Sequence, residues 1–100
     1  MIEVLYGVNV VDESGYAAYR AHMTPILEAH GGAFRVDTKV AEVLRAPSPT
    51  PFNRLFTICF PTLERLEAFF ANPEYLAVRR RFFEPSVSAT TVLGRYQVLP

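Results

Sequence analysis

The side chains best suited to chemistry in this sequence are a set of tyrosines and arginines. Tyr16 and Tyr19 share one face of a predicted helix, and Tyr75 and Arg79 share a face of another, because residues three or four apart are neighbours on a helix surface. Phenol hydroxyls and a guanidinium could line a mostly apolar pocket between helices and sheet, suited to a small organic acid or a phenolic ligand. Arg35, on a predicted strand, is a second guanidinium candidate for an anionic ligand.

The same residues also allow a purely structural interpretation. The tyrosines would then lie at the edge of the core with their hydroxyls in water. Arg79 would pair with a carboxylate such as Glu74 or Glu84, and Arg35 would be an exposed strand residue.

Two histidines are the only imidazoles, and neither belongs to a metal motif. His22 and His30 lie eight residues apart on one predicted helix, about 12 Å along its axis, which is too far to share one metal ion. No HExxH spacing occurs, so we expect no metal site. His30 precedes Gly31 at the predicted helix end, where the helix dipole favours a protonated imidazole. His30 is therefore either a capping residue or the candidate catalytic proton shuttle.

Composition and charge argue against several classes of partner. Nine arginines and Lys39 balance ten acidic residues, so the net charge is zero, unlike that of a bulk nucleic-acid binder. Arg79, Arg80 and Arg81 would spread over about 200° of a helix and form no phosphate-binding stripe. Cys59 has no activating base nearby in the sequence, and no glycine-rich phosphate loop or nucleophile elbow occurs. We therefore expect no cofactor and no nucleic-acid partner.

The length of 100 residues predicts one domain covering residues 1–100. No basic region precedes an apolar run at the amino end, and the single cysteine excludes an internal disulfide. No apolar stretch approaches the roughly 20 residues that cross a membrane. The expected location is the cytoplasm, without a membrane partner.

The first half of the chain predicts a strand, a helix and a second strand. Ile2–Val11 is rich in β-formers and partly alternating. Asp12 is the N-cap candidate of a helix that ends at Gly31 and Gly32, with a kink or break expected near Thr24 because Pro25 removes a hydrogen bond. Ala33–Leu44 predicts the second strand, with a bend around Asp37 and Thr38.

The second half repeats the order strand, helix, strand. After the proline-rich connection 47–51, Phe52–Phe60 predicts a third strand. Thr62 caps a second helix over 63–70, and Asn72 caps a short third helix over 73–83. Ser88–Leu99 predicts the fourth strand.

This order predicts an α+β protein with the ferredoxin-like β-α-β-β-α-β arrangement, a four-stranded antiparallel sheet and a short extra helix before the last strand. Helices would cover one sheet face. The other face is too apolar to be left to water, so we predict a homodimer in which the two open sheet faces pack together.

Several strings resemble the domain of unknown function 1330 family. They are Tyr16-Ala17-Ala18-Tyr19 with Pro25, the stretch His30-Gly31-Gly32-Ala33-Phe34-Arg35-Val36, the stretch Phe60-Pro61-Thr62-Leu63-Glu64, and Ala71-Asn72-Pro73-Glu74-Tyr75. The resemblance runs from the first strand to about Arg81. It implies a dimeric α+β barrel, a small intracellular bacterial protein without an assigned activity. Wider relatives of that architecture include cofactorless monooxygenases, isomerases and haem-binding enzymes, but shared fold does not transfer a chemistry.

Two functional hypotheses remain open at this point. In the first, the protein is a binder of a small acidic or phenolic molecule or a cofactor-independent enzyme, and its pocket uses Tyr16, Tyr19, Arg35, Tyr75 and Arg79. In the second, it is a structural or assembly module without catalytic activity. The sequence leaves open whether any reaction is catalysed.

Overall fold

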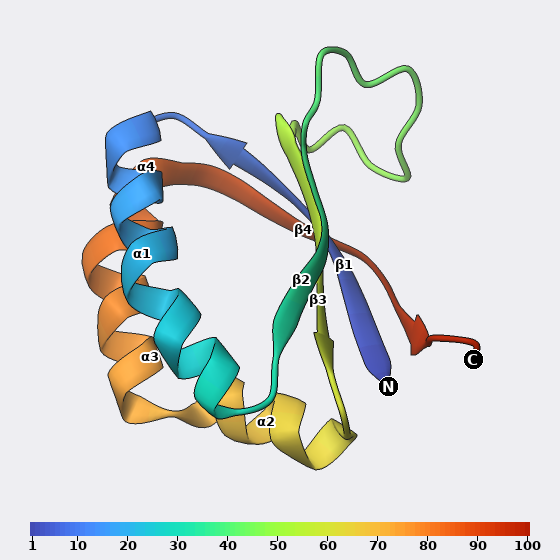
Figure 1. Cartoon of the computed structure of the whole chain (residues 1–100). Helices are drawn as coiled ribbons and strands as arrows, with labels where there is room; N and C mark the ends of the chain where they lie inside the picture. Colours follow the sequence, from blue (N-terminus) through green and yellow to red (C-terminus); the bar gives the residue numbers. More distant parts are fainter.

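One antiparallel sheet and a layer of helices make up the computed structural model, which describes residues 1–100 (Figure 1). In chain order the elements are β1 (Ile2–Val10), α1 (Glu13–Ala29), β2 (Ala33–Lys39), β3 (Arg54–Phe60), α2 (Leu63–Ala71), α3 (Pro73–Val78), the π-helical turn η1 (Arg79–Phe83), α4 (Glu84–Ser86) and β4 (Val87–Gln97). The strands lie in the order β2-β3-β1-β4, and every neighbouring pair is antiparallel. The predicted ferredoxin-like arrangement is confirmed.

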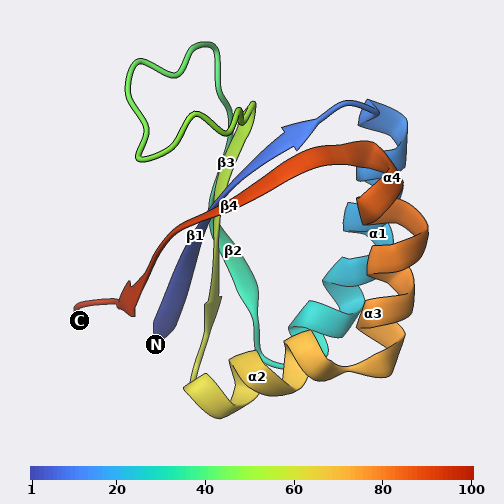
Figure 2. The same cartoon turned by 180° about the vertical axis from the view of Figure 1, so that it is seen from behind.

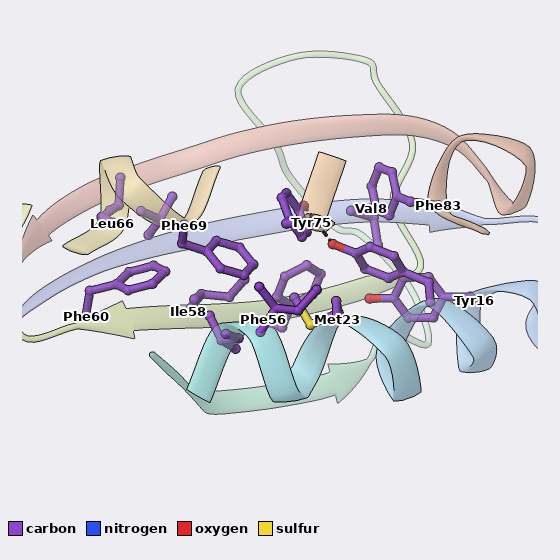
Figure 3. Packing of buried hydrophobic residues seen from close by; sticks show 14 of the residues in the cluster. Val8, Tyr16, Met23, Phe56, Ile58, Phe60, Leu66, Phe69, Tyr75 and Phe83 are labelled. Carbon is purple, nitrogen blue, oxygen red and sulfur yellow. Dashed lines mark hydrogen bonds between the residues drawn. The ribbon is translucent and has the colours of Figure 1, made fainter. Parts of the chain in front are cut away.

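The helices all lie on one side of the sheet and leave the other face open (Figures 1 and 2). Alternation along β1 explains this division, because successive side chains of a strand point to opposite faces. Val4 and Val8 are buried beneath the helices, whereas Leu5 between them is half-buried on the open face. The core therefore lies between the sheet and the helix layer, as Figure 3 shows.

Of the kink or break predicted near Thr24, the break is wrong, because helix α1 is continuous through Pro25. Proline removes only one backbone donor, and the carbonyl left without it belongs to the exposed Ala21, where water can replace the bond. Asp12 caps the helix start as predicted, accepting a hydrogen bond from the Gly15 amide at 3.1 Å. The helix ends before Gly31, whose φ of 75° suits glycine.

Strand β2 ends at Lys39, five residues before the predicted end at Leu44. Lys39 pairs with Arg54, so residues 42 and 44 of a longer strand would have to lie opposite Pro51 and Pro49, which have no backbone N–H to donate. Val40–Pro51 consequently forms a loop, and Leu44 is 87% exposed. The predicted bend in this strand corresponds to a β-bulge between Phe34 and Asp37.

The caps of the later helices agree with the sequence prediction. Thr62 accepts from the Arg65 amide at 3.2 Å, and Asn72 accepts from the Tyr75 amide at 3.0 Å. The third predicted helix is less regular than expected, because it passes through the π-turn η1, and it closes in α4 at Ser86. Strand β4 follows at once. No helix has both the length and the apolar character needed to cross a bilayer.

Candidate ligand-binding cavity

A cavity of about 380 Å³ lies between the sheet and helices α1 and α3 with the turn η1. Its lining residues are mostly apolar and come from every layer of the fold: Tyr6, Val8, Tyr19, Arg20, Met23, Phe34, Phe56, Ile58, Phe70, Tyr75, Leu76, Arg79, Phe83, Thr90 and Val92. No lining residue is acidic, and none is a histidine or a cysteine. The polar groups of the lining are therefore phenols, two guanidiniums and one threonine hydroxyl.

Two of the phenols are bonded to each other deep in the structure. The hydroxyls of Tyr19 and Tyr75 lie 2.8 Å apart, so one donates to the other and one proton stays free for another acceptor. Figure 3 draws this bond as a dashed line beside Tyr75. Burial is the main cause that raises the pKa of both tyrosines. Both are therefore neutral hydrogen-bonding groups at physiological pH.

Tyr6 brings a third phenol to the cavity from the central strand. Among the five tyrosines it is the one whose hydroxyl has no hydrogen-bond partner in the chain. Burial raises the pKa of Tyr6 to about 12, and the charges of nearby arginines only partly offset this. Its ring stacks on Phe56 at a centroid distance of 5.5 Å, so the hydroxyl is held by a packed ring.

Arg79 stands at the edge of the cavity on η1. Its side chain is 41% exposed, and its guanidinium carbon lies 5.1 Å from the centre of the Phe83 ring. Its one ion pair joins Nη1 to an oxygen of Glu84 at 3.6 Å, and Glu84 is itself exposed. Such a solvated pair is weak, so the Arg79 charge remains available to a ligand.

Arg20 is the second lining guanidinium, and the chain already neutralises it. Its two terminal nitrogens donate to both oxygens of Asp37 at 2.9 and 3.0 Å, and Nε donates to the Tyr16 hydroxyl at 3.0 Å. The guanidinium also lies 4.0 Å from the centre of the Phe34 ring. The bulge in β2 makes the pair with Asp37 possible, because the extra residue turns Asp37 toward α1. Arg20 thus fixes the edge strand to the helix and closes one end of the cavity.

The structure brings together three of the residues that the sequence singled out. Tyr19, Tyr75 and Arg79 all line the cavity. Tyr16 lies behind the lining and is fully buried against Arg20. Tyr16 therefore supports the wall without facing the space.

Arg35 and His30 do not line the cavity. The prediction that they share one pocket with Tyr19, Tyr75 and Arg79 is therefore wrong for these two residues. Arg35 follows Phe34 in β2 and so points to the open face of the sheet, where it pairs with the buried Glu3 at 3.3 Å. His30 stands at the end of α1, with Nδ1 2.8 Å from the Ile26 carbonyl and its ring against Phe69. This is the capping role that the sequence offered as the alternative for His30.

Sequence reasoning missed Tyr6 and Arg20 as cavity residues. The signal for Tyr6 was its alternation with Val4 and Val8. Residues 4, 6 and 8 of one strand point to the same side of the sheet, here the side that the helices cover. For Arg20 the signal was its position four residues after Tyr16, which places the two side chains side by side on α1. Its partner Asp37 could not be found in this way, because it depends on the bulge in β2.

Comparison with known proteins places the chain in a family whose description assigns it no function. The family model described as "Domain of unknown function (DUF1330)" matches residues 4–93, and no curated protein matches the chain. A solved protein of unknown function from Rhodopseudomonas palustris is similar at a TM-score of 0.78 and 18% identity, over 99% of this chain and 82% of that one.

Two further solved structures share the fold at lower similarity. A dimeric protein of unknown function from Bacteroides fragilis has a TM-score of 0.53 and 12% identity, over 97% of this chain and 95% of that one. A variant of MhuD with two manganese protoporphyrin IX molecules bound per active site has a TM-score of 0.57 and 17% identity, over 100% and 96% of the two chains. At these identities the likeness concerns the fold alone. The family match is the more specific finding, and by it the chain belongs to the DUF1330 family.

Proposed function

We propose that this protein binds a small, largely apolar molecule with an acidic or phenolic group in the cavity between the sheet and α1, α3 and η1. One observation carries the proposal: an apolar cavity of about 380 Å³ whose polar groups are neutral phenols and arginines, with no carboxylate among them. Its volume lies at the lower end of the range for small-molecule sites, roughly 300–1,000 Å³. The lining offers hydrogen-bond donors and positive charge, which suit an acceptor-rich ligand.

The polar residues of the cavity have distinct roles in this proposal. Tyr19 and Tyr75 together keep one hydroxyl proton free to donate, and the unpartnered Tyr6 hydroxyl donates a second. Arg79 supplies the charge that attracts an acid. Arg20 is committed to Asp37 and serves to hold the wall, so we assign it a positioning role.

Plugging the mouth of the cavity tests the proposal. Leu76 lines the cavity at 39% exposure, so Leu76→Trp adds bulk at the mouth without cutting into the core. Ala77→Trp is the matched control, because Ala77 is the next residue of α3, exposed and outside the lining. The probes are 2-naphthoate and 2-naphthol, measured by isothermal titration calorimetry.

We expect the wild type and Ala77→Trp to bind at least one probe, and Leu76→Trp to bind it at least tenfold more weakly. Two results would refute the proposal: neither probe binds the folded wild type, or Leu76→Trp binds as well as the control. The first of these would favour the alternative, a structural module without a ligand.

We also propose that two copies pair through their open sheet faces. Leu5 and Leu55 lie half-buried on this face, and Phe52 packs over Gly7 beside them. A second copy would remove these apolar groups from water in one isologous contact. A dimeric protein of similar fold from Bacteroides fragilis supports pairing as such, and the choice of the open sheet face rests on these apolar groups.

The mass in solution tests the pairing. Analytical ultracentrifugation at micromolar concentration is expected to give twice the chain mass of 11.3 kDa for the wild type and one chain mass for Leu5→Glu. Leu63→Glu is the control, because Leu63 is exposed on α2, on the covered side of the sheet. A wild-type monomer would contradict the proposed pairing.

A further inference from the structure

We propose that the acidic group of the ligand is a carboxylate, and that Arg79 and Arg95 bind it at the mouth of the cavity beside the Tyr6 hydroxyl. This inference rests on the proposed function and narrows it. The ligand class becomes apolar monocarboxylates, and phenols become weak ligands. It also adds Arg95, a residue outside the cavity lining, as a determinant of specificity.

The register of β4 brings Arg95 to the side of the sheet that carries the cavity. Arg95 lies opposite Val4, whose side chain is buried in the core, and cross-strand partners share a face. Val92 lies opposite Tyr6 and lines the cavity. Arg95 lies three residues after Val92 in β4 and is the next residue of this strand on the same face.

A β-bulge decides this placement. The pairing of β1 with β4 shifts between Leu5 and Tyr6, which leaves one extra residue in β4 between Val92 and Arg95. Without the extra residue, strict alternation from Val92 would turn position 95 to the open face. Tyr96 takes that face instead, where its hydroxyl donates to Glu3 at 2.6 Å.

Arg79 and Arg95 are the guanidiniums near Tyr6 that the chain leaves available. Arg95 has no ion pair within the chain, and Arg79 has only the long, exposed contact with Glu84. Both positive charges act on the Tyr6 phenol, where they oppose the effect of burial on its pKa. Two available cations therefore lie within electrostatic reach of a hydroxyl that itself has no partner.

This combination favours a carboxylate over a phenol. A carboxylate is ionised at pH 7 and accepts paired hydrogen bonds from a guanidinium, whereas a simple phenol has a pKa near 10 and stays neutral. The apolar body of the ligand then extends inward along Phe83, Val8 and Phe56, which supply aromatic and aliphatic walls. The charged end stays at the mouth, where water limits the cost of desolvation.

Three probes share one naphthalene ring and differ in their polar group, so they separate the effect of charge from that of shape. They are 2-naphthoate, the neutral 2-naphthamide and 2-naphthol. Each is titrated at pH 7 and low salt into the wild type, Arg95→Gln and Arg80→Gln. Arg80 is the matched control, because it is exposed on the same turn as Arg79 but lies outside the lining. Circular dichroism confirms that each variant is folded.

We expect the wild type to bind 2-naphthoate about tenfold or more tightly than 2-naphthamide or 2-naphthol, as a charge-assisted contact implies. Arg95→Gln should lose most of this preference while its binding of 2-naphthamide stays unchanged. Arg95→Lys should restore part of the preference, and Arg80→Gln should match the wild type.

Two results would overturn the inference. The first is equal affinity of the wild type for 2-naphthoate and 2-naphthamide, and the second is an equal loss of affinity for both probes in Arg95→Gln. In either case the neutral probe still binds, so the proposed cavity function stands. Failure of all three probes to bind the folded wild type would overturn the proposed function itself and this inference with it.

Discussion

Replacing Tyr75 by Phe should destabilise the protein more than replacing its hydrogen-bond partner Tyr19 by Phe. Both rings are almost fully buried, at 4% and 5% exposure, and their hydroxyls bond to each other at 2.8 Å. Tyr75→Phe keeps the ring but leaves the Tyr19 hydroxyl without its partner. An unsatisfied buried hydroxyl costs about 1–3 kcal/mol, and we expect about 2 kcal/mol here.

Tyr19→Phe should cost only about 1 kcal/mol, because the Tyr75 hydroxyl that remains lies beside the Arg79 guanidinium. The double variant removes both hydroxyls and leaves neither group unsatisfied. Its cost should therefore be about 1–1.5 kcal/mol, well below the sum of about 3 kcal/mol for the two single changes. The difference is the coupling energy of the pair.

Urea unfolding at pH 7, followed by circular dichroism, measures all three variants. Tyr6→Phe is the control for loss of a tyrosine hydroxyl, because the Tyr6 hydroxyl has no hydrogen-bond partner in the chain and its removal leaves no group unsatisfied. Additive costs would refute the coupling of the two hydroxyls, and a larger cost for Tyr19→Phe than for Tyr75→Phe would refute the asymmetry derived from Arg79.

Two further predictions concern the same layer of the molecule. Burial raises the pKa of Tyr6 to about 12, whereas in the unfolded chain this phenol loses its proton near pH 10. The stability that depends on the neutral Tyr6 phenol is therefore complete below pH 10 and is lost between pH 10 and 12. Tyr6 alone should lower the free energy of unfolding in this window by about 1.4 kcal/mol per pH unit. Urea unfolding at several pH values should therefore show a shallower fall for Tyr6→Phe than for the wild type. Equal slopes would contradict the raised pKa of Tyr6. Arg20→Met keeps the aliphatic stem but removes the bonds to Asp37 and Tyr16, and should cost about 1–2 kcal/mol. Hydrogen exchange should show faster opening of β2 in this variant than in Arg80→Met, and identical protection would show that the pair does not hold the edge strand.

Much of the fold could be predicted because its signals are local. Asp12, Thr62 and Asn72 each cap the helix that the sequence assigned to them, since a side-chain oxygen needs only the amides of the next turn. The cavity residues Tyr19, Tyr75 and Arg79 were found for the same reason, through helical spacing alone.

The errors arose where a result depends on pairing between distant segments. The end of β2 at Lys39 follows from the prolines that would lie opposite a longer strand, Pro51 and Pro49, rather than from residues 40–44 themselves. The unbroken α1 at Pro25 follows from the exposure of the carbonyl four residues earlier. Arg35 was assigned to the pocket although its neighbour Phe34 already occupies that face.

The sequence by itself determined the order of elements, the caps and the aromatic character of the space beneath the helices, because period and local hydrogen bonding are written in consecutive residues. Only the tertiary structure decided which polar groups face that space. Two β-bulges each add one residue to a strand and so reverse the side to which the following residues point, which turns Asp37 toward Arg20 and places Arg95 on the same sheet face as Tyr6. A bulge depends on how two strands pair, and that pairing is fixed by the packing of the whole sheet against its helices.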